Sequence, residues 1–146
     1  MTTEMAEPVA TSRISGLLGA ARRRIAPRPT PADLEQLVAE GALVVDIRPS
    51  ELRRRDGEMP GAIVIDRNVL EWRLDPTSPD RCPEAAQAGP GSCIVVVCDE
   101  GYASSLAAAT LRDVGLLGAT DLDGGYQAWR RHAARRSERS AKSNRT

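Results

Sequence analysis

A cysteine ends the most hydrophobic run of the sequence and is followed at once by two acids, a glycine and two serines. The run is CIVVVC at residues 93–98, and DEGYASS carries the chain on to residue 105. If the run is a strand and a helix begins within about six residues of Cys98, the chain must turn sharply at Gly101. The loop amides can then point inward as an anion-binding nest, and the amino end of the helix adds partial positive charge. Because such surroundings favour a thiolate, the pattern predicts that Cys98 is a nucleophile.

Asp99 and Glu100 oppose this thiolate. A carboxylate about 8 Å from the sulfur costs the thiolate roughly 0.5 kcal/mol in water and about 2 kcal/mol at an effective dielectric constant of 20. The helix terminus stabilises the thiolate by only about 0.3–1 kcal/mol. Amide donors or cations must therefore supply the rest. Arg67, directly after an apolar run at residues 62–66, is the expected substrate-facing cation, and the alternative is a surface arginine paired with an acid.

The alternative for Cys98 itself is a small buried hydrophobe that finishes a strand. Cys93, at the start of the same run, fits that description better, and Cys82 lies in a polar loop as an incidental thiol. The three cysteines and His132 do not form a recognisable zinc set. No histidine lies within motif range to act as a general base, so a protease-like mechanism is not expected. The sequence predicts neither a metal nor a cofactor.

Apolar runs of strand type alternate with helical patterns along the chain. Continuous apolar strands, as opposed to alternating ones, are typical of a parallel sheet that is covered on both faces. The fold class is therefore α/β, with three α/β/α layers around a central parallel sheet. The expected strands are at 42–47, 62–66, 93–98 and 118–124, and the expected helices are within 29–41, 49–57, 67–75, 104–115 and 125–136.

Chemically useful side chains follow three of these strands. Asp46 and Arg48 follow the first, Arg67 the second, and residues 98–105 the third. Since ligands bind at the carboxyl ends of parallel strands, these groups should share one rim. Asp46 is expected to orient backbone or a neighbour, and Arg48 to form a salt bridge with Glu51, so both are structural parts of that rim.

Four segments, in the right order and spacing, resemble the rhodanese-like (sulfurtransferase) family over residues 29–131. They are VVDIRPSE, GEMPGA, VVVCDEGYASS and LDGGYQAW. The resemblance implies about five parallel strands, with PRPT at residues 27–30 as a weak edge strand. It also implies that Cys98 takes a sulfane sulfur and holds it as a persulfide. The substrate would then be bound by Arg67 and by the loop residues Asp99, Glu100, Gly101, Tyr102, Ala103 and Ser104.

The chain departs from the family pattern at three places. Glu58 stands where the family often has histidine, at a rim position of modest consequence. Asp99 and Glu100 replace residues that are often neutral or basic, and Ala103 replaces a frequent Arg, Ser or Thr. The acidic loop is easier to reconcile with a cationic or protein-borne persulfide donor than with dianionic thiosulfate.

The resemblance implies a sulfurtransferase with a small sulfur donor, thiosulfate or a persulfide, and a thiol or cyanide acceptor. A protein partner in a sulfur relay is a further expectation. Two other functions stay open. One is a non-catalytic rhodanese-like module whose loop binds an anion or a partner. The other is an arsenate- or phosphate-directed enzyme on the related fold, against which the loop length of Cys98–Ala103 speaks.

The formal net charge of zero hides an uneven distribution. Residues 1–28 carry five arginines against two acids, and residues 130–146 carry seven basic residues against one acid, which leaves the middle strongly acidic. We expect a flexible basic extension at 1–28, one domain at 29–131 and a disordered basic tail at 132–146. No nucleic-acid contact is predicted, because no interleaved aromatics accompany the charges. The apolar stretch GLLGAA is too short for a signal peptide or a membrane span, which favours a cytoplasmic protein.

Overall fold

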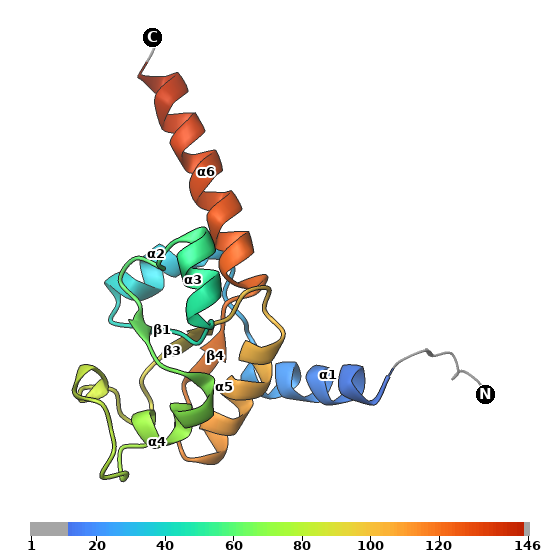
Figure 1. Cartoon of the computed structure of the whole chain (residues 1–146), viewed down its shortest axis with the longest axis vertical. Coiled ribbons are helices and arrows are strands. Elements are labelled where there is room, and N and C mark those ends of the chain that lie inside the picture. Colours follow the sequence, from blue (N-terminus) through green and yellow to red (C-terminus); the bar gives the residue numbers. More distant parts are fainter. Residues whose placement is uncertain (1–11, 145–146) are drawn as a thin grey trace.

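Four parallel strands form the central sheet in the computed structural model, which describes residues 12–144 (Figure 1). Their order across the sheet is β2-β1-β3-β4. All residues of β3 are buried, because β3 is an inner strand that is covered on both faces. The predicted α/β class and parallel sheet are confirmed. The strands are β1 (Leu43–Asp46), β2 (Ile63–Val64), β3 (Ile94–Val97) and β4 (Ala119–Asp121).

Helices cover both faces of this sheet and make the outer two layers. Ile94 and Val96 of β3 face a core formed with α1, α4 and α5. Val95 and Val97 face a second core formed with α2 and α6. Successive side chains of a strand point to opposite faces, so one short apolar run supplies both cores. The helices are α1 (Arg13–Ile25), α2 (Pro31–Ala39), α3 (Ser50–Asp56), α4 (Leu70–Leu74), α5 (Ala103–Asp113) and α6 (Gly125–Ser143), with short 3-10 turns η2 (Arg67–Val69) and η3 (Pro83–Ala85).

The expected fifth strand does not form among residues 12–144, so the sheet has four strands where about five were predicted. The PRPT segment does run beside β4, where the Asp123 N–H donates to the Pro29 carbonyl at 2.9 Å. Pro27 and Pro29 have no amide hydrogen, however, and a segment with alternate prolines cannot build a strand ladder. Residues 26–30 therefore follow the edge of the sheet as irregular chain.

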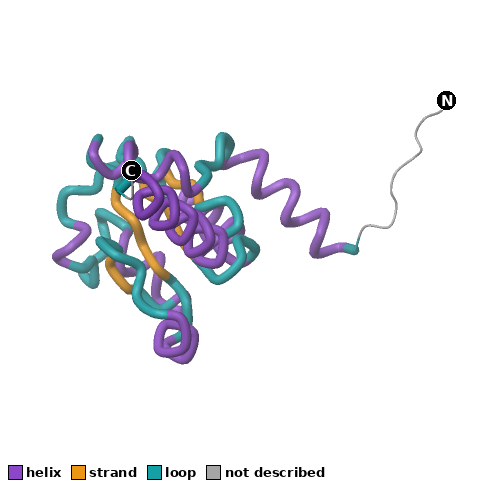
Figure 2. Tube along the Cα trace, turned by 90° about the horizontal axis from the view of Figure 1, so that it is seen from above, coloured by secondary structure: helices purple, strands orange, loops and turns teal. Residues whose placement is uncertain are grey.

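Both basic ends contain helix. Helix α1 packs against α5 and its far end leads away from the domain, and α6 projects from the domain over its second half (Figures 1 and 2). Residues 1–11 and 145–146 of the expected extension and tail lie outside the described residues. The domain limits of 29 and 131 stay predictions. Within residues 12–144, no helix is both long and apolar enough to cross a membrane.

Leu111 of α5 tests the core on the α1 side of the sheet. Its side chain is fully buried, whereas Leu117 is 64% exposed. Leu111→Ala should lower the free energy of unfolding by about 2–5 kcal/mol, because it removes buried methyl groups and leaves a cavity. Leu117→Ala should change it by less than about 0.5 kcal/mol. Urea unfolding measures both, and equal losses in the two variants would contradict this placement of the core.

Candidate active site

Strand β3 delivers Cys98 to the carboxyl edge of the sheet, and a tight loop joins it to α5. Gly101 turns this loop with a φ of +90°, a conformation that favours glycine. The first turn of α6 holds the loop from outside. The Tyr126 N–H donates to the Cys98 carbonyl at 2.9 Å, and the Gln127 N–H donates to the Asp99 carbonyl at 3.1 Å. The carbonyls of the first two peptides of the loop are therefore both fixed by α6.

Backbone amides converge on the Cys98 sulfur. The Gly101 N–H lies 3.1 Å from Sγ and the Ser104 N–H lies 3.3 Å from it. The sulfur also lies 3.1 Å from the Ser104 hydroxyl oxygen. Because Ser104 is in the first turn of α5, the partial positive charge at this helix end adds to the amide donors. Converging N–H donors stabilise a thiolate or an anion attached to sulfur.

The two loop acids are not hydrogen-bonded to this sulfur. The Asp99 carboxylate accepts from the Gln127 side-chain amide at 3.0 Å and lies 4.0 Å from the Arg55 guanidinium. Glu100 is exposed to solvent. Water and an arginine therefore screen both charges, which shifts the balance toward the amide donors.

A third acid, which was not predicted from the sequence, is linked to the Cys98 sulfur through the Ser104 hydroxyl. Asp121 at the end of β4 is fully buried. Its Oδ2 accepts from the Ser104 hydroxyl at 2.6 Å and from the Ser105 hydroxyl at 2.8 Å. The Arg28 guanidinium donates to its Oδ1 at 2.7 Å. The available signal was an aspartate within the expected strand at 118–124, in ATDL, whose place beside the Cys98 loop only the sheet order reveals.

A cavity of about 380 Å³ opens beside Cys98 at the rim. The side chains of Ile47 and Leu52 form apolar walls, and the loop from Cys98 to Ala103 forms the other side. Tyr102 is 59% exposed, and the Arg22 guanidinium lies 5.4 Å from the centre of its ring. Cys98 lines this cavity and keeps 8% of its residue surface exposed, so a small reactant in the cavity would lie beside it. Ala103, Glu100 and Asp99 also line this cavity, and their contact with a substrate stays a prediction.

The predicted pairing of Arg48 with Glu51 is wrong. Arg48 is buried and pairs with Asp46, with 2.8 Å between Nη2 and Oδ2. Its guanidinium also donates to the Gly57 carbonyl and lies 3.7 Å from the centre of the Tyr126 ring. The side chain turned inward because the buried Asp46 carboxylate needs a counter-charge, and water cannot provide one there. Arg48 borders the cavity, and Asp46 holds the Arg48 side chain in place.

Arg67 borders the same cavity, but its guanidinium is already paired. Its Nη1 donates to both carboxylate oxygens of Glu71, at 3.0 and 2.9 Å. The structure thus brings Arg48, Arg67 and the Cys98 loop to one rim, as expected from the strand ends. The direct contact of Arg67 with substrate stays a prediction.

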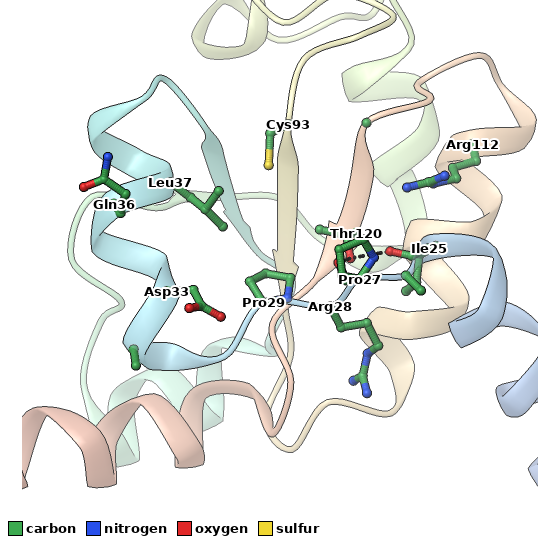
Figure 3. A pocket seen from close by; sticks show the side chains of 13 residues that line it. Ile25, Pro27, Arg28, Pro29, Asp33, Gln36, Leu37, Cys93, Arg112 and Thr120 are labelled. Carbon is green, nitrogen blue, oxygen red and sulfur yellow. Dashed lines mark hydrogen bonds between the residues drawn. The ribbon is translucent and has the colours of Figure 1, made fainter.

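Cys93 is at the other end of β3 and lies in a different environment. It borders a second cavity of about 550 Å³, between α2 and the chain at Ile25 and Pro27 (Figure 3). Among residues 12–144, no hydrogen-bond donor reaches its sulfur. Burial and, to a lesser extent, the negative charge of Glu40 raise the pKa of the Cys93 thiol. A raised pKa makes Cys93 a poor nucleophile at neutral pH.

The described residues contain no cluster of three or more His, Cys, Asp or Glu side chains placed to hold a metal ion.

Comparisons with known proteins agree with this geometry. A family model described as Rhodanese-like domain matches residues 30–132. Adenylyltransferase and sulfurtransferase MOCS3-1 from Zea mays is 33% identical over 106 residues, which cover 71% of this chain and 22% of the maize protein. The chain therefore spans 22% of the length of that relative.

Solved structures give the same result. RPA3614 from Rhodopseudomonas palustris, a protein of unknown function described as a possible tyrosine phosphatase, has a TM-score of 0.72 and 33% identity, and the match covers 88% of this chain and 96% of that one. The human single-domain sulfurtransferase TSTD1 has a TM-score of 0.57 and 29% identity, with 71% and 95% of the two chains covered.

Gly101 tests whether the loop conformation sustains the sulfur contacts. A Cβ at Gly101 would lie 2.9 Å from the Gly124 nitrogen, whereas a Cβ at Gly115, which has a similar φ of +95°, would meet nothing within 4 Å. Both Gly→Ala changes strain the backbone by about 1–2 kcal/mol. Only Gly101→Ala must also move the loop and withdraw an N–H from Cys98.

We therefore expect alkylation of Cys98 by iodoacetamide at pH 7 to slow several-fold in Gly101→Ala and to keep its rate in Gly115→Ala. Peptide mass spectrometry reports the modification at Cys98 separately from the other cysteines. Equal rates in the two variants would show that the loop amides do not matter to the sulfur.

Proposed function

The chain belongs to the rhodanese-like domain family, and we propose that it is a sulfurtransferase that carries a sulfane sulfur as a persulfide on Cys98. The convergence of the Gly101 and Ser104 N–H groups on Sγ, at 3.1 and 3.3 Å, carries this proposal. Both the attacking thiolate and the outer sulfur of a persulfide are anionic at some point in the cycle. Fixed N–H donors stabilise such charge without having to reorganise.

The proposed cycle has two steps, and neither needs a general base. The Cys98 thiolate attacks the sulfane sulfur of the donor, a new S–S bond forms, and the donor leaves as sulfite or as a thiolate. A thiol or cyanide acceptor then attacks the outer sulfur, and the Cys98 thiolate leaves. The Cys98 thiol releases its proton to solvent before the first step.

The cavity residues take positioning roles in this cycle. Gly101 and Ser104 of the adjoining loop supply amide donors, and Tyr102 and Ala103 line the cavity. Arg67 is within the same cavity wall, where exchange of its Glu71 contact for a donor anion would place it on the substrate. The proposal extends to the sulfur donor and the sulfur acceptor in the cell, and it includes a protein partner in a sulfur relay.

Two other functions compete with sulfur transfer. In a non-catalytic module the same amides would bind an anion or partner while the sulfur stays unmodified. A phosphatase is the second, because the similar Rhodopseudomonas palustris protein is described as a possible one. The loop at residues 98–104 contains no arginine and two acids. A phosphate ester dianion would therefore gain amide donors and meet like charge, which disfavours this chemistry.

Mass spectrometry under non-reducing conditions tests the proposal. After incubation with thiosulfate or glutathione persulfide, the wild type should gain the mass of one sulfur atom. Cys98→Ser should gain none at this position, and Cys93→Ser should gain it like the wild type, because only Cys98 has amide donors. An unmodified wild type with both donors would refute sulfur loading and favour the binding module. Hydrolysis of p-nitrophenyl phosphate that depends on Cys98 would favour the phosphatase.

The acidic loop predicts which donor works better. At about 8 Å in water, each carboxylate repels a dianion by roughly 1 kcal/mol, and salt screens part of this. Asp99→Ser/Glu100→Ser should therefore lower the KM for thiosulfate about tenfold at low ionic strength, and less at high ionic strength. It should change the KM for a persulfide of lower charge much less.

The matched control removes two acids elsewhere. Asp80→Ser/Glu84→Ser changes the net charge equally, in a segment that contributes no residue to the Cys98 cavity. Thiosulfate turnover that is equally fast with wild type and with Asp99→Ser/Glu100→Ser would remove the basis for this donor preference.

A further inference from the structure

Two arginines that precede the family-matched region donate hydrogen bonds to the Cys98 loop. Arg22 of α1 donates to the Gly101 carbonyl at 2.7 Å and to the Ser105 hydroxyl at 3.1 Å. Arg28 donates to the same carbonyl at 3.2 Å and to both oxygens of Asp121, at 2.7 and 3.2 Å. The family match begins at residue 30. A part of the chain outside that match therefore reaches the reactive loop.

The hydrogens in this cluster can be assigned by counting donors. An ionised carboxylate only accepts, so the hydroxyls of Ser104 and Ser105, at 2.6 and 2.8 Å from Oδ2, both donate to Asp121. The Gly101 carbonyl, 3.2 Å from the Ser105 hydroxyl, is the more distant alternative acceptor for Ser105. The Ser104 hydroxyl has a single hydrogen. While that hydrogen points at Asp121, the Ser104 oxygen can only accept, and the Cys98 S–H is the donor across their 3.1 Å contact.

When Cys98 loses its proton, the Ser104 hydroxyl must donate a hydrogen bond to the sulfur instead of accepting one. A thiolate has no hydrogen to give, so it needs the Ser104 hydrogen that Asp121 holds. Asp121 can release it because the Ser105 hydroxyl and the Arg28 guanidinium remain as donors. Without Arg28, the buried carboxylate would keep the Ser104 hydroxyl and would also repel the thiolate.

We infer that the Arg28–Asp121 pair, acting through the Ser104 hydroxyl, sets how readily Cys98 loses its proton. Arg28 and Asp121 are positioning residues, because neither touches the sulfur. The proton goes to solvent, and no proton transfer to Asp121 is needed. This inference rests on the proposed function, in which the Cys98 thiolate is the attacking species.

The state of Arg28 agrees with this role. Burial alone would lower the pKa of its guanidinium, but the hydrogen bond and charge of Asp121, together with the smaller effects of the Asp123 and Cys98 charges, outweigh burial and raise the pKa. The arginine is therefore a permanent counter-charge. The other charged or titratable groups that face Cys98 from the surrounding elements are Arg48 of the β1 end, Arg67 of η2, Asp99, Glu100 and Tyr102 of the loop, and Arg22 of α1.

The pH dependence of Cys98 alkylation tests the inference in the full-length protein. Iodoacetamide rates at Cys98, followed by peptide mass spectrometry, give the pH midpoint of thiolate formation. Arg28→Ala should move this midpoint up by about one pH unit, which reduces the thiolate fraction about tenfold below the midpoint. Arg28→Lys should recover part of the shift. Asp121→Asn should move the midpoint down, because it removes the competing charge.

Midpoint shifts of opposite sign in Arg28→Ala and Asp121→Asn separate this role from a structural one. A purely structural role would move the two midpoints in the same direction or would move neither. Arg24→Ala is the matched control: it removes the ion pair of α1 with Asp113 on α5 but no contact to the loop. It should leave the midpoint unchanged. An equal shift with Arg24→Ala, or a wild-type midpoint in Arg28→Ala, would overturn the inference.

Ser104→Ala provides a test that does not depend on folding of the Asp121 variant. Without the hydroxyl, the effect of Arg28→Ala on the midpoint should shrink to less than half. An undiminished effect in the Ser104→Ala background would refute coupling through Ser104. None of these measurements uses a sulfur donor, so a failure of sulfur loading and a failure of this inference are distinguishable.

Discussion

The site depends on backbone N–H groups that point at one sulfur, and this direction has a cost elsewhere in the loop. In a trans peptide the N–H and the C=O point in opposite directions, so a loop whose amides turn inward has carbonyls that point outward, and each such carbonyl needs a donor. The carbonyls of Cys98 and Asp99 receive N–H groups from the first turn of α6. The Gly101 carbonyl receives the guanidiniums of Arg22 and Arg28. The loop at Cys98 is therefore supported from outside by a segment that precedes the family-matched region and by the first turn of α6 within it.

The uneven charge of the sequence has a structural counterpart. Arginines of the basic ends pair with acids of the acidic middle, through Arg24 with Asp113, Arg28 with Asp121, Arg130 with Asp56 and Arg136 with Glu35. Three of these pairs are partly exposed and contribute little to stability. The Arg28–Asp121 pair is different, because Asp121 is fully buried and its partner nearly so. Removing one member of a buried pair leaves an uncompensated charge.

The sequence predicted the strands and the place of Cys98 at the end of β3 well, for a local reason. Neighbouring residues determine each of these features: a fully buried run such as IVVV, a glycine at a positive φ, and a helix that starts directly after the loop. The partners of Arg48 and Asp121 were not predictable in this way. Arg48 had Glu51 one helical turn away and Asp46 two residues back, and burial decided between them. Asp121 meets Ser104 only because β4 lies next to β3, a relation across 17 residues that periodicity does not contain.

The size of the cavity and the small exposure of the sulfur together limit how a donor can approach. Cys98 is 8% exposed at a cavity of about 380 Å³, a volume at the small end for ligand sites. A small molecule or the tip of one flexible side chain fits such a space, whereas a rigid protein surface would stop at Tyr102 and Glu100. In the proposed cycle, a protein donor would therefore have to present its persulfide on a flexible arm. Glu100 is exposed and Asp99 is half-buried, whereas the N–H contacts to the Cys98 sulfur are buried. Selection by charge would thus occur at the entrance, and stabilisation of the anion at the base of the site.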